Sequence, residues 1–372
     1  MTMESRVGGV SATTGATAVD VAARERAYAG TSYFGSLDAV RAVSVIAVLW
    51  HHTVIPNEDL PISGRGFLGV DMFFALSGFL ITTILLREQA ASGDISLRRF
   101  YARRSLRIFP LYYAIVFGCL ALALLSDSPQ LTAIEDSAPQ MIFYLTNWFP
   151  TISLLAVSWS LATEEQFYLV WPPLQKLLGG LALVPMVLFL GANQLVNFGL
   201  LFSDSREELE ILQVTFTPII LGVLLAYLLH HRYSVAWTLF GHRLVAPGLV
   251  VALLVVISLP SSETSMVGAH RLVVHLIMTA LLGALVVAED HLLAPYLRGR
   301  LLVRIGAVSY GMYLMHMFVR HVFVEMFDIA DAISLPLTLF VAVTVVTYLV
   351  AELSFRVFES PLLRLKPGRG NG

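Results

Sequence analysis

The chain has 372 residues, of which 57% are hydrophobic and only 13% are charged, and its mean hydropathy is +0.75. Soluble domains carry about 25% charged residues, so this composition excludes a water-soluble globular protein and makes lipid the solvent for most of the chain. A net charge of -2 gives no support to nucleic-acid binding. The single cysteine, Cys119, excludes an intramolecular disulfide and a thiolate metal cluster.

Residues 1–35 have no compact apolar stretch, so we predict a mostly disordered cytoplasmic tail there rather than a signal peptide. The rest of the chain contains ten apolar stretches, each long enough to cross a bilayer as a helix. They are 37–55, 66–87, 106–126, 160–178, 181–202, 211–230, 244–260, 269–289, 301–324 and 335–358. Backbone groups in hydrocarbon must be hydrogen-bonded within their own segment or in a closed β-barrel, and runs of about 20 apolar residues without alternation favour helices. We therefore predict an all-α, polytopic transmembrane helical bundle of about ten spans.

The segment 138–155 is interrupted by Pro139 and Pro150 and does not have the pattern of a continuous spanning helix. Its aromatic residues favour an interfacial or re-entrant position at headgroup level, with an eleventh helix as the alternative.

Lys and Arg fall mainly in alternate connections, most densely from Arg87 to Arg107, whereas the other connections hold mostly Asp and Glu. Short cytoplasmic loops collect Lys and Arg, so this pattern predicts an even number of spans with both termini in the cytoplasm. Residues 362–372 then form a cytoplasmic C-terminal tail. The expected location is the bacterial cytoplasmic (inner) membrane, with the lipid bilayer as a partner.

The first stretch carries Asp38, Arg41 and the pair His51 and His52. A charge at the bilayer centre costs at least about 2.5 kcal/mol, which makes ionisable groups inside spans candidates for function. Eleven residues are about three helical turns, so Arg41 and His52 share one helix face roughly 16 Å apart along the axis. The alternative interpretation makes Arg41 an interfacial anchor and the histidines a pair at the outer interface.

The second stretch contains Asp71 and Ser77 among apolar residues, with Gly69 and Gly78 allowing close helix approach. Asp71 is a candidate to pair with a neighbouring cation or to orient a histidine. For Ser77, simple helix packing is the favoured alternative.

A basic run precedes the third stretch, where Arg99, Arg103 and Arg107 recur every four residues and Arg104 lies three residues before Arg107. A helix therefore gathers several guanidinium groups at its cytoplasmic end. Guanidinium groups bind phosphate oxygens in a bidentate manner, although a topological stop signal also explains a basic run.

The sequence TEEQ, Thr163 to Gln166, is typical of a capping box at a helix N-terminus, which accounts for Thr163 and Gln166 but not for two adjacent carboxylates. Glu164 and Glu165 point about 100° apart, so one of them can face the bundle interior. Farther along, Tyr310, Tyr313 and His316 recur every three residues and form a polar stripe that suits a pocket wall, with an interfacial aromatic belt as the alternative.

These blocks resemble the motifs of the acyltransferase-3 family of bacterial membrane O-acyltransferases. The similar segments are LDAVRA with the histidine eleven residues after its arginine, GVDMFFALSGFLIT, RRSLRIFPLYY, SWSLATEEQFYL, SYGMYLMH and the terminal E-x-x-x-R-x-x-E-x-P. The resemblance covers residues 36–361, which we take as the transmembrane acyltransferase domain. Ala39 and Ala75 stand where the family often has glycine and valine.

The resemblance implies an enzyme that transfers an acyl group, most often acetyl, from acyl-CoA to a hydroxyl of a carbohydrate-containing acceptor. That acceptor is a polysaccharide, a glycolipid or a macrolide-type glycoside. Some relatives carry a C-terminal extracytoplasmic hydrolase-like domain. The sequence ends soon after Pro361, so we expect transfer within the membrane domain itself.

In this hypothesis Arg41, Arg104 and Arg107 handle acyl-CoA and His52 is the general base, with an acyl-histidine intermediate as the alternative. Glu164 or Glu165 would stabilise the imidazolium. The full predicted site has catalytic residues His52, Glu164, Glu165 and Asp71; donor-binding residues Arg41, Arg103, Arg104 and Arg107; and pocket residues Asp38, Ser77, Trp159, Tyr168, Tyr310, Tyr313 and His316.

Two other classes of membrane protein share some of these features. A transporter or flippase would share the charged interior but should show duplicated halves, which the sequence lacks. A haem or metal redox protein would use His51, His52, His275 and His316 as ligands, but it leaves the arginine cluster unexplained. We expect no metal and no nucleic-acid partner.

Overall fold

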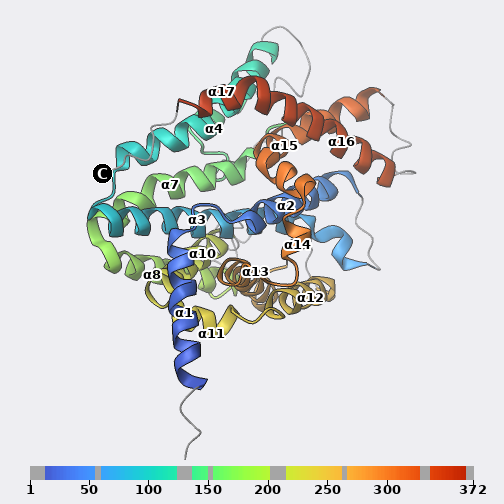
Figure 1. Cartoon of the computed structure of the whole chain (residues 1–372). Helices are drawn as coiled ribbons and strands as arrows, with labels where there is room; N and C mark the ends of the chain where they lie inside the picture. The colour runs from blue at the N-terminus through green and yellow to red at the C-terminus, as the bar shows by residue number, and fades with distance from the viewer. Residues whose placement is uncertain are drawn as a thin grey trace, which may run out of the picture.

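The computed structural model describes residues 13–54, 60–123, 136–149, 154–201, 215–261, 266–326 and 336–365. Within these ranges every element of regular secondary structure is helical, which confirms the predicted all-α class (Figure 1). The principal helices are α1 (Thr13–Gly30), α2 (Gly35–Thr53), α3 (Leu68–Ser92), α4 (Leu97–Ala123), α7 (Ser158–Leu178), α8 (Leu183–Asn197), α10 (Phe216–His231), α12 (Val245–Ser258), α13 (Ala269–Val287), α15 (Arg300–Met326) and α16 (Pro336–Ser354).

Shorter elements connect these helices. They are η1 (Pro61–Phe67), α6 (Ala138–Ile142), η2 (Gly179–Ala182), α11 (Tyr233–Phe240), α14 (Ala294–Leu297), the π-helix η5 (Phe355–Glu359) and α17 (Ser360–Leu363). Each of the ten predicted apolar stretches overlaps a helix from α2 to α16, because a helix satisfies all the backbone groups of a long apolar run within the run itself.

Length and composition alone identify six described helices that are apolar enough to cross a membrane, or up to eight if two bent helix pairs each count as one span. In this count α7 and α8 fall within a single apolar stretch of 40 residues, Ser158–Asn197. Helix α12, with 14 residues, is shorter than a full span. The number of ten spans and the position of the termini therefore stay predictions.

Helices α2 and α3 form the centre of the bundle, and they pack against each other. In the view of Figure 1, α4, α7, α15, α16 and α17 lie on one side of this pair, and α8, α10, α11, α12 and α13 lie on the other. Helix α3 packs along α10, and α2 packs along α15. Elements from both ends of the sequence thus meet at the central pair, where they can enclose a site.

The crossing of α3 and α10 depends on two glycines. A Cβ atom at Gly78 would collide with the carbonyl oxygen of Ile219, and one at Gly222 would collide with the carbonyl oxygen of Ala75. Only glycine lets the two backbones approach so closely, as in other membrane helix pairs.

Replacing Gly78 with alanine is therefore expected to lower the free energy of unfolding by about 1 to 3 kcal/mol, the usual cost of overpacking. Thermal unfolding of the purified protein in detergent measures this loss. Gly118→Ala is the matched control, because a Cβ at Gly118 meets nothing within 4 Å. Equal stability of the two variants would contradict the proposed close crossing.

The predicted disordered tail differs from the structure over Thr13–Gly30, where the chain forms α1. The side chain of Tyr28 is buried and packs against Phe34 and Tyr233. Arg24 lies over the ring of Trp237, 4.5 Å from its centroid. These contacts with the helical bundle hold a segment whose own composition is too polar to predict a helix.

The interrupted segment 138–155 has the short helix α6 followed by turns, so within its described part there is no eleventh spanning helix. The side-chain amide of Asn147 donates to Thr163 at 3.3 Å and to Gln166 at 2.9 Å. The predicted capping box is wrong, because α7 begins at Ser158 and both residues lie inside the helix. Thr163 and Gln166 instead tie this turn to α7.

Candidate active site

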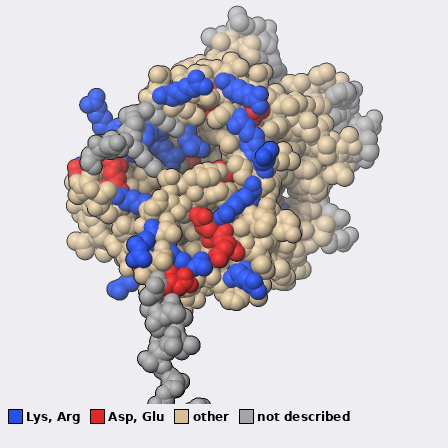
Figure 2. All heavy atoms as spheres, viewed as in Figure 1, with Lys and Arg blue, Asp and Glu red and all other residues tan. Residues whose placement is uncertain are grey.

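A cavity of about 1330 Å³ lies between α2, α3, α4, α7 and α15. Its mouth is lined by the connection between α1 and α2, the end of α3 and the start of α4. Figure 2 shows this face of the molecule hollowed, with Lys and Arg side chains around the opening. The deep end of the lining, inside the bundle, includes Val70, Ser160 and Tyr313.

Six arginines line the cavity, and four of them have partners of their own. Arg41 pairs with Asp38, and Arg99 and Arg103 lie 3.8 Å and 3.6 Å from the carboxylate oxygens of Glu88. The fourth, Arg87, donates to the backbone carbonyls of Tyr28 and Thr31. These contacts neutralise or occupy the guanidinium groups nearest the mouth.

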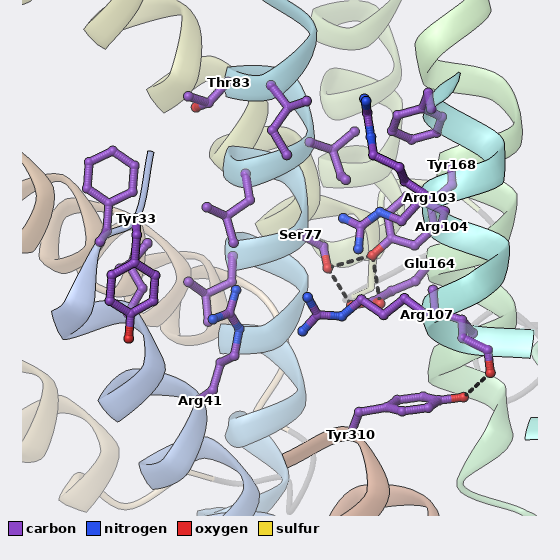
Figure 3. A pocket seen from close by; sticks show the side chains of 18 of the residues that line it. Tyr33, Arg41, Ser77, Thr83, Arg103, Arg104, Arg107, Glu164, Tyr168 and Tyr310 are labelled. Carbon is purple, nitrogen blue, oxygen red and sulfur yellow. Dashed lines mark hydrogen bonds between the residues drawn. The ribbon is translucent and has the colours of Figure 1, made fainter. Parts of the chain in front are cut away.

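The remaining two are Arg104 and Arg107, the predicted donor-binding pair. Among the residues that the structure describes, neither forms an ion pair with a carboxylate. Arg104 lies over the ring of Tyr168, 4.6 Å from its centroid, and Arg107 points towards Arg41 across the cavity (Figure 3). Since Arg41 is paired with Asp38, Arg104 and Arg107 bring the unneutralised positive charge to this part of the cavity, which is suited to bind an anion.

The mouth also holds an ion pair between Lys176 of α7 and Asp94, which lies in the connection from α3 to α4. The Lys176 Nζ atom is 2.6 Å from the Asp94 carboxylate. A hydrogen bond from Lys176 holds the pKa of Asp94 below its ordinary value. The pair ties the start of α4, and with it the arginine run, to the end of α7.

Glu164 faces the cavity and is held by two hydroxyl groups. Ser77 donates to its Oε1 atom at 2.7 Å, and Tyr168 donates to its Oε2 atom at 2.9 Å (Figure 3). Ser77 and Tyr168 also lie 2.9 Å apart, which closes a three-membered network. The structure therefore brings together three predicted residues, but it joins Glu164 to hydroxyls and not to a histidine.

Glu165 does not line the cavity, in keeping with the 100° between adjacent helical side chains. Its Oε1 atom is buried and has no hydrogen-bond partner among the described residues. Trp159 is also outside the cavity lining and packs edge-on against Phe74, with ring centroids 6.0 Å apart. The structure thus separates two predicted site residues from the cavity.

Two residues of the polar stripe on α15, Tyr310 and Tyr313, line the cavity wall, whereas the third, His316, does not. Tyr310 donates to the carbonyl of Ile108 at 2.8 Å. The hydroxyl of Tyr313 lies 2.7 Å from Ser160 Oγ and 2.9 Å from the carbonyl of Val157. These bonds fix both rings, and Tyr313 forms part of the deep end of the cavity.

His52 lies beyond this deep end and is not part of the cavity lining. Its Nδ1 atom is 2.9 Å from the carbonyl of Val48 and 3.3 Å from His316 Nε2. His316 is buried one helical turn from Tyr313, and their ring centroids are 5.8 Å apart. The predicted contact of His52 with Glu164 or Glu165 is absent, because Glu164 is engaged by Ser77 and Tyr168.

Asp71 belongs to a separate buried cluster. Its carboxylate lies 2.7 Å from Arg271 NH2 and 2.9 Å from His275 Nε2, and all three side chains are at most 5% exposed. Asp71 therefore does pair with a cation and a histidine, as one predicted alternative has it, but neither partner is in the active-site cavity. The predicted catalytic role is not supported by this position.

Three residues were not expected from the sequence: two of them line the cavity and one lies in the Asp71 cluster. Phe73 lines the deep end of the cavity, and its ring centroid is 6.4 Å from that of Tyr313. Glu359, from the π-helix η5, lines the wall, and Arg271 binds Asp71. Glu359 belongs to the terminal motif, but nothing in that motif indicates that its side chain lines a cavity. Arg271 lies at the start of an apolar stretch, where a charged residue is expected in a connecting loop. No group of three or more metal-ligating side chains occurs within the described ranges.

The comparison with known proteins decides the family. Residues 34–354 match the family model of the acyltransferase-3 acyltransferase domain. The chain belongs to the acyltransferase-3 family. It is therefore an acyltransferase, and its apolar helices make it a multi-pass membrane enzyme.

The relatives of this acyltransferase are named as O-acetyltransferases. It is 29% identical over 362 residues to the peptidoglycan O-acetyltransferase OatA of Listeria monocytogenes, covering 89% of this chain and 56% of that protein. It is 28% identical over 357 residues to the putative peptidoglycan O-acetyltransferase YrhL of Bacillus subtilis, covering 89% and 55%. A putative O-acetyltransferase of Staphylococcus aureus strain COL is 28% identical over 377 residues, covering 90% and 58%.

The acyltransferase spans little more than half the length of these curated relatives. No solved structure matches it.

Proposed function

We propose that this acyltransferase transfers an acyl group, with acetyl as the simplest case, from acyl-CoA to a hydroxyl of a carbohydrate-containing acceptor. The observation that carries the proposal is the cavity in which Arg104 and Arg107 form no ion pair with a carboxylate of the described residues. Coenzyme A carries a pyrophosphate and a 3′-phosphate, and guanidinium groups match phosphate oxygens in geometry and charge. A volume of about 1330 Å³ exceeds the 300–1,000 Å³ of ordinary ligand pockets, as a long donor molecule requires.

The mouth of the cavity faces the cytoplasm in this proposal. Lys and Arg residues surround the opening (Figure 2), and cytoplasmic connections of membrane proteins are enriched in these residues. Acyl-CoA is a cytoplasmic metabolite, so the donor would enter from this side and place its phosphates against α4.

The acyl end of the donor would then point to the deep end of the cavity. Tyr313 and Phe73 lie at that end, and His316 and His52 lie beyond them. The reaction therefore requires the rings of Tyr313 and Phe73 to move and open a path to His52. His52 takes the proton from the acceptor hydroxyl as its oxygen attacks the thioester carbon. The new C–O bond forms, the C–S bond breaks, and the proton passes from His52 to the leaving sulfur.

The acceptor would approach from the opposite end of the bundle. His51 and His52 are only half-buried there, and the ring of His51 packs against Phe67 at the end of η1. The names of two relatives point to peptidoglycan, which makes a cell-surface carbohydrate the acceptor class we favour. A glycolipid or a glycosylated small molecule has the same reacting hydroxyl.

Replacing Arg107 with glutamine is expected to weaken the binding of acetyl-CoA about 10- to 100-fold, because a hydrogen bond to a charged group contributes about 1.5 to 3 kcal/mol. Calorimetric titration of the purified enzyme in detergent measures the effect. Acetyl-pantetheine, which lacks the phosphates, should bind the variant and the wild type equally.

Arg98→Gln is the matched control, since Arg98 lies on the same helix but is exposed and outside the cavity lining. Unchanged acetyl-CoA affinity in Arg107→Gln, or the same loss in Arg98→Gln, would exclude this donor site.

A further inference from the structure

The contact between His52 and His316 joins the first and the penultimate long apolar helices of the described chain. Their ring centroids are 4.9 Å apart, and 264 positions separate them in the sequence. His316 is fully buried, whereas His52 is half-buried, so one ring is sealed in the bundle and the other is accessible.

The hydrogen bonds of the pair determine which nitrogen carries each proton. The carbonyl of Tyr313 lies 2.6 Å from His316 Nδ1, and a carbonyl only accepts, so Nδ1 of a neutral His316 bears the hydrogen and Nε2 bears the lone pair. By the same reasoning the carbonyl of Val48, 2.9 Å from His52 Nδ1, places the hydrogen of neutral His52 on Nδ1. His52 Nδ1–H can then donate to both Val48 and His316 Nε2, which is 3.3 Å away.

We infer that His316 is the positioning residue of the active site, which holds His52 as the Nδ1–H tautomer so that Nε2 of His52 is the basic nitrogen. The inference rests on the proposed role of His52. In hydrolases a carboxylate orients the catalytic histidine in this way. Here the group that accepts the hydrogen bond from His52 is the neutral imidazole of His316, because no carboxylate of the described residues contacts His52.

The same contact acts when His52 becomes charged. An imidazolium at His52 keeps its Nδ1–H pointed at two acceptors, the lone pair of His316 Nε2 and the Val48 carbonyl. These two hydrogen-bond acceptors stabilise the imidazolium without placing a fixed negative charge near the hydroxyl of the incoming substrate. The other titratable or charged neighbours are His51 on α2 and Arg320 on α15.

A purely structural role for His316 predicts different kinetics from a positioning role. His316→Phe keeps a planar ring in the buried site but removes the acceptor, and His316→Gln keeps an acceptor in its side-chain oxygen. If His316 positions His52, kcat should fall about 10- to 100-fold in His316→Phe, the loss typical of removing a residue that orients a metal-ligating histidine. The KM values for donor and acceptor should stay within about twofold of wild type, and His316→Gln should recover part of kcat.

The control is His321→Phe, on the same helix but partly exposed and 4.0 Å from Glu325, which should keep wild-type kcat. All rates are referred to folded enzyme, quantified by its monodisperse fraction in detergent. Wild-type kcat in His316→Phe, or an equal loss in His316→Gln and His316→Phe, overturns the inference. Wild-type kcat in His52→Ala overturns the proposed function instead, so the two failures are distinguishable.

Discussion

Replacing His52 with alanine is expected to lower kcat for acyl transfer about 100- to 10,000-fold, which is the usual contribution of a general base. A hydroxyl is a poor nucleophile until it loses its proton, and His52 is the histidine that lies beyond the deep end of the cavity in contact with His316. Binding of acetyl-CoA should be unchanged, because the arginines that we propose to bind its phosphates lie at the other end of α2 and on α4. Single-turnover transfer from labelled acetyl-CoA measures the rate.

His51→Ala is the matched control for this experiment. His51 is adjacent in sequence, but its ring packs against Phe67, with centroids 5.6 Å apart, and within the described residues it is His52 that contacts His316. Its loss should change kcat less than about tenfold, far below the effect of a missing general base. A larger loss in His51→Ala than in His52→Ala would assign the base to His51 and contradict the register that the Arg41 spacing predicts.

Asp71→Ala is expected to lower the free energy of unfolding by about 3 kcal/mol, since breaking a buried ion pair typically costs 3–5 kcal/mol. Its carboxylate is the partner of both Arg271 and His275, and all three side chains are almost completely buried. The cluster lies outside the cavity lining, so kcat of the folded fraction should stay near that of wild type. Thermal unfolding in detergent, with activity per folded molecule, separates the two effects.

Two further variants sharpen this result. The triple variant Asp71→Leu/Arg271→Met/His275→Leu removes all three polar partners and should recover most of the lost stability, because well-packed apolar residues often replace a buried ion pair or triad without cost. Asp290→Ala removes the partly exposed pair with Arg24 and should cost less than about 1 kcal/mol. A loss of kcat in Asp71→Ala without a loss of stability would return Asp71 to the catalytic residues.

The sequence predicted the structure best where local geometry alone decides the outcome, as in the apolar stretches and in the spacing of residues along one helix. The apolar stretches form helices, because a long apolar run without alternation satisfies its backbone in lipid as a helix. Spacing placed Arg104 and Arg107 on the face of α4 that lines the cavity, and it placed Tyr310 and Tyr313 on the cavity wall of α15. A helical period fixes which residues share a face, so such predictions depend on local geometry alone.

Contacts between helices that are distant in the sequence could not be predicted from the sequence. The TEEQ pattern at Thr163 fits a helix start, yet the helix begins at Ser158 and Asn147 uses the same side chains. The polar composition of residues 1–35 gave no sign that Tyr28 would be buried against Tyr233 and support α1. In both cases tertiary contacts outweighed a weak local preference.

By itself the sequence determined that this protein is a helical membrane protein, through its hydrophobic composition, and it placed His52 and the arginines of the proposed donor site among the candidate residues. Only the tertiary structure decided the partners of those residues: Ser77 and Tyr168 for Glu164, Arg271 and His275 for Asp71, and His316 for His52. The physical reason is that an ionisable group buried in lipid must find a partner, but which partner depends on how helices far apart in sequence pack together.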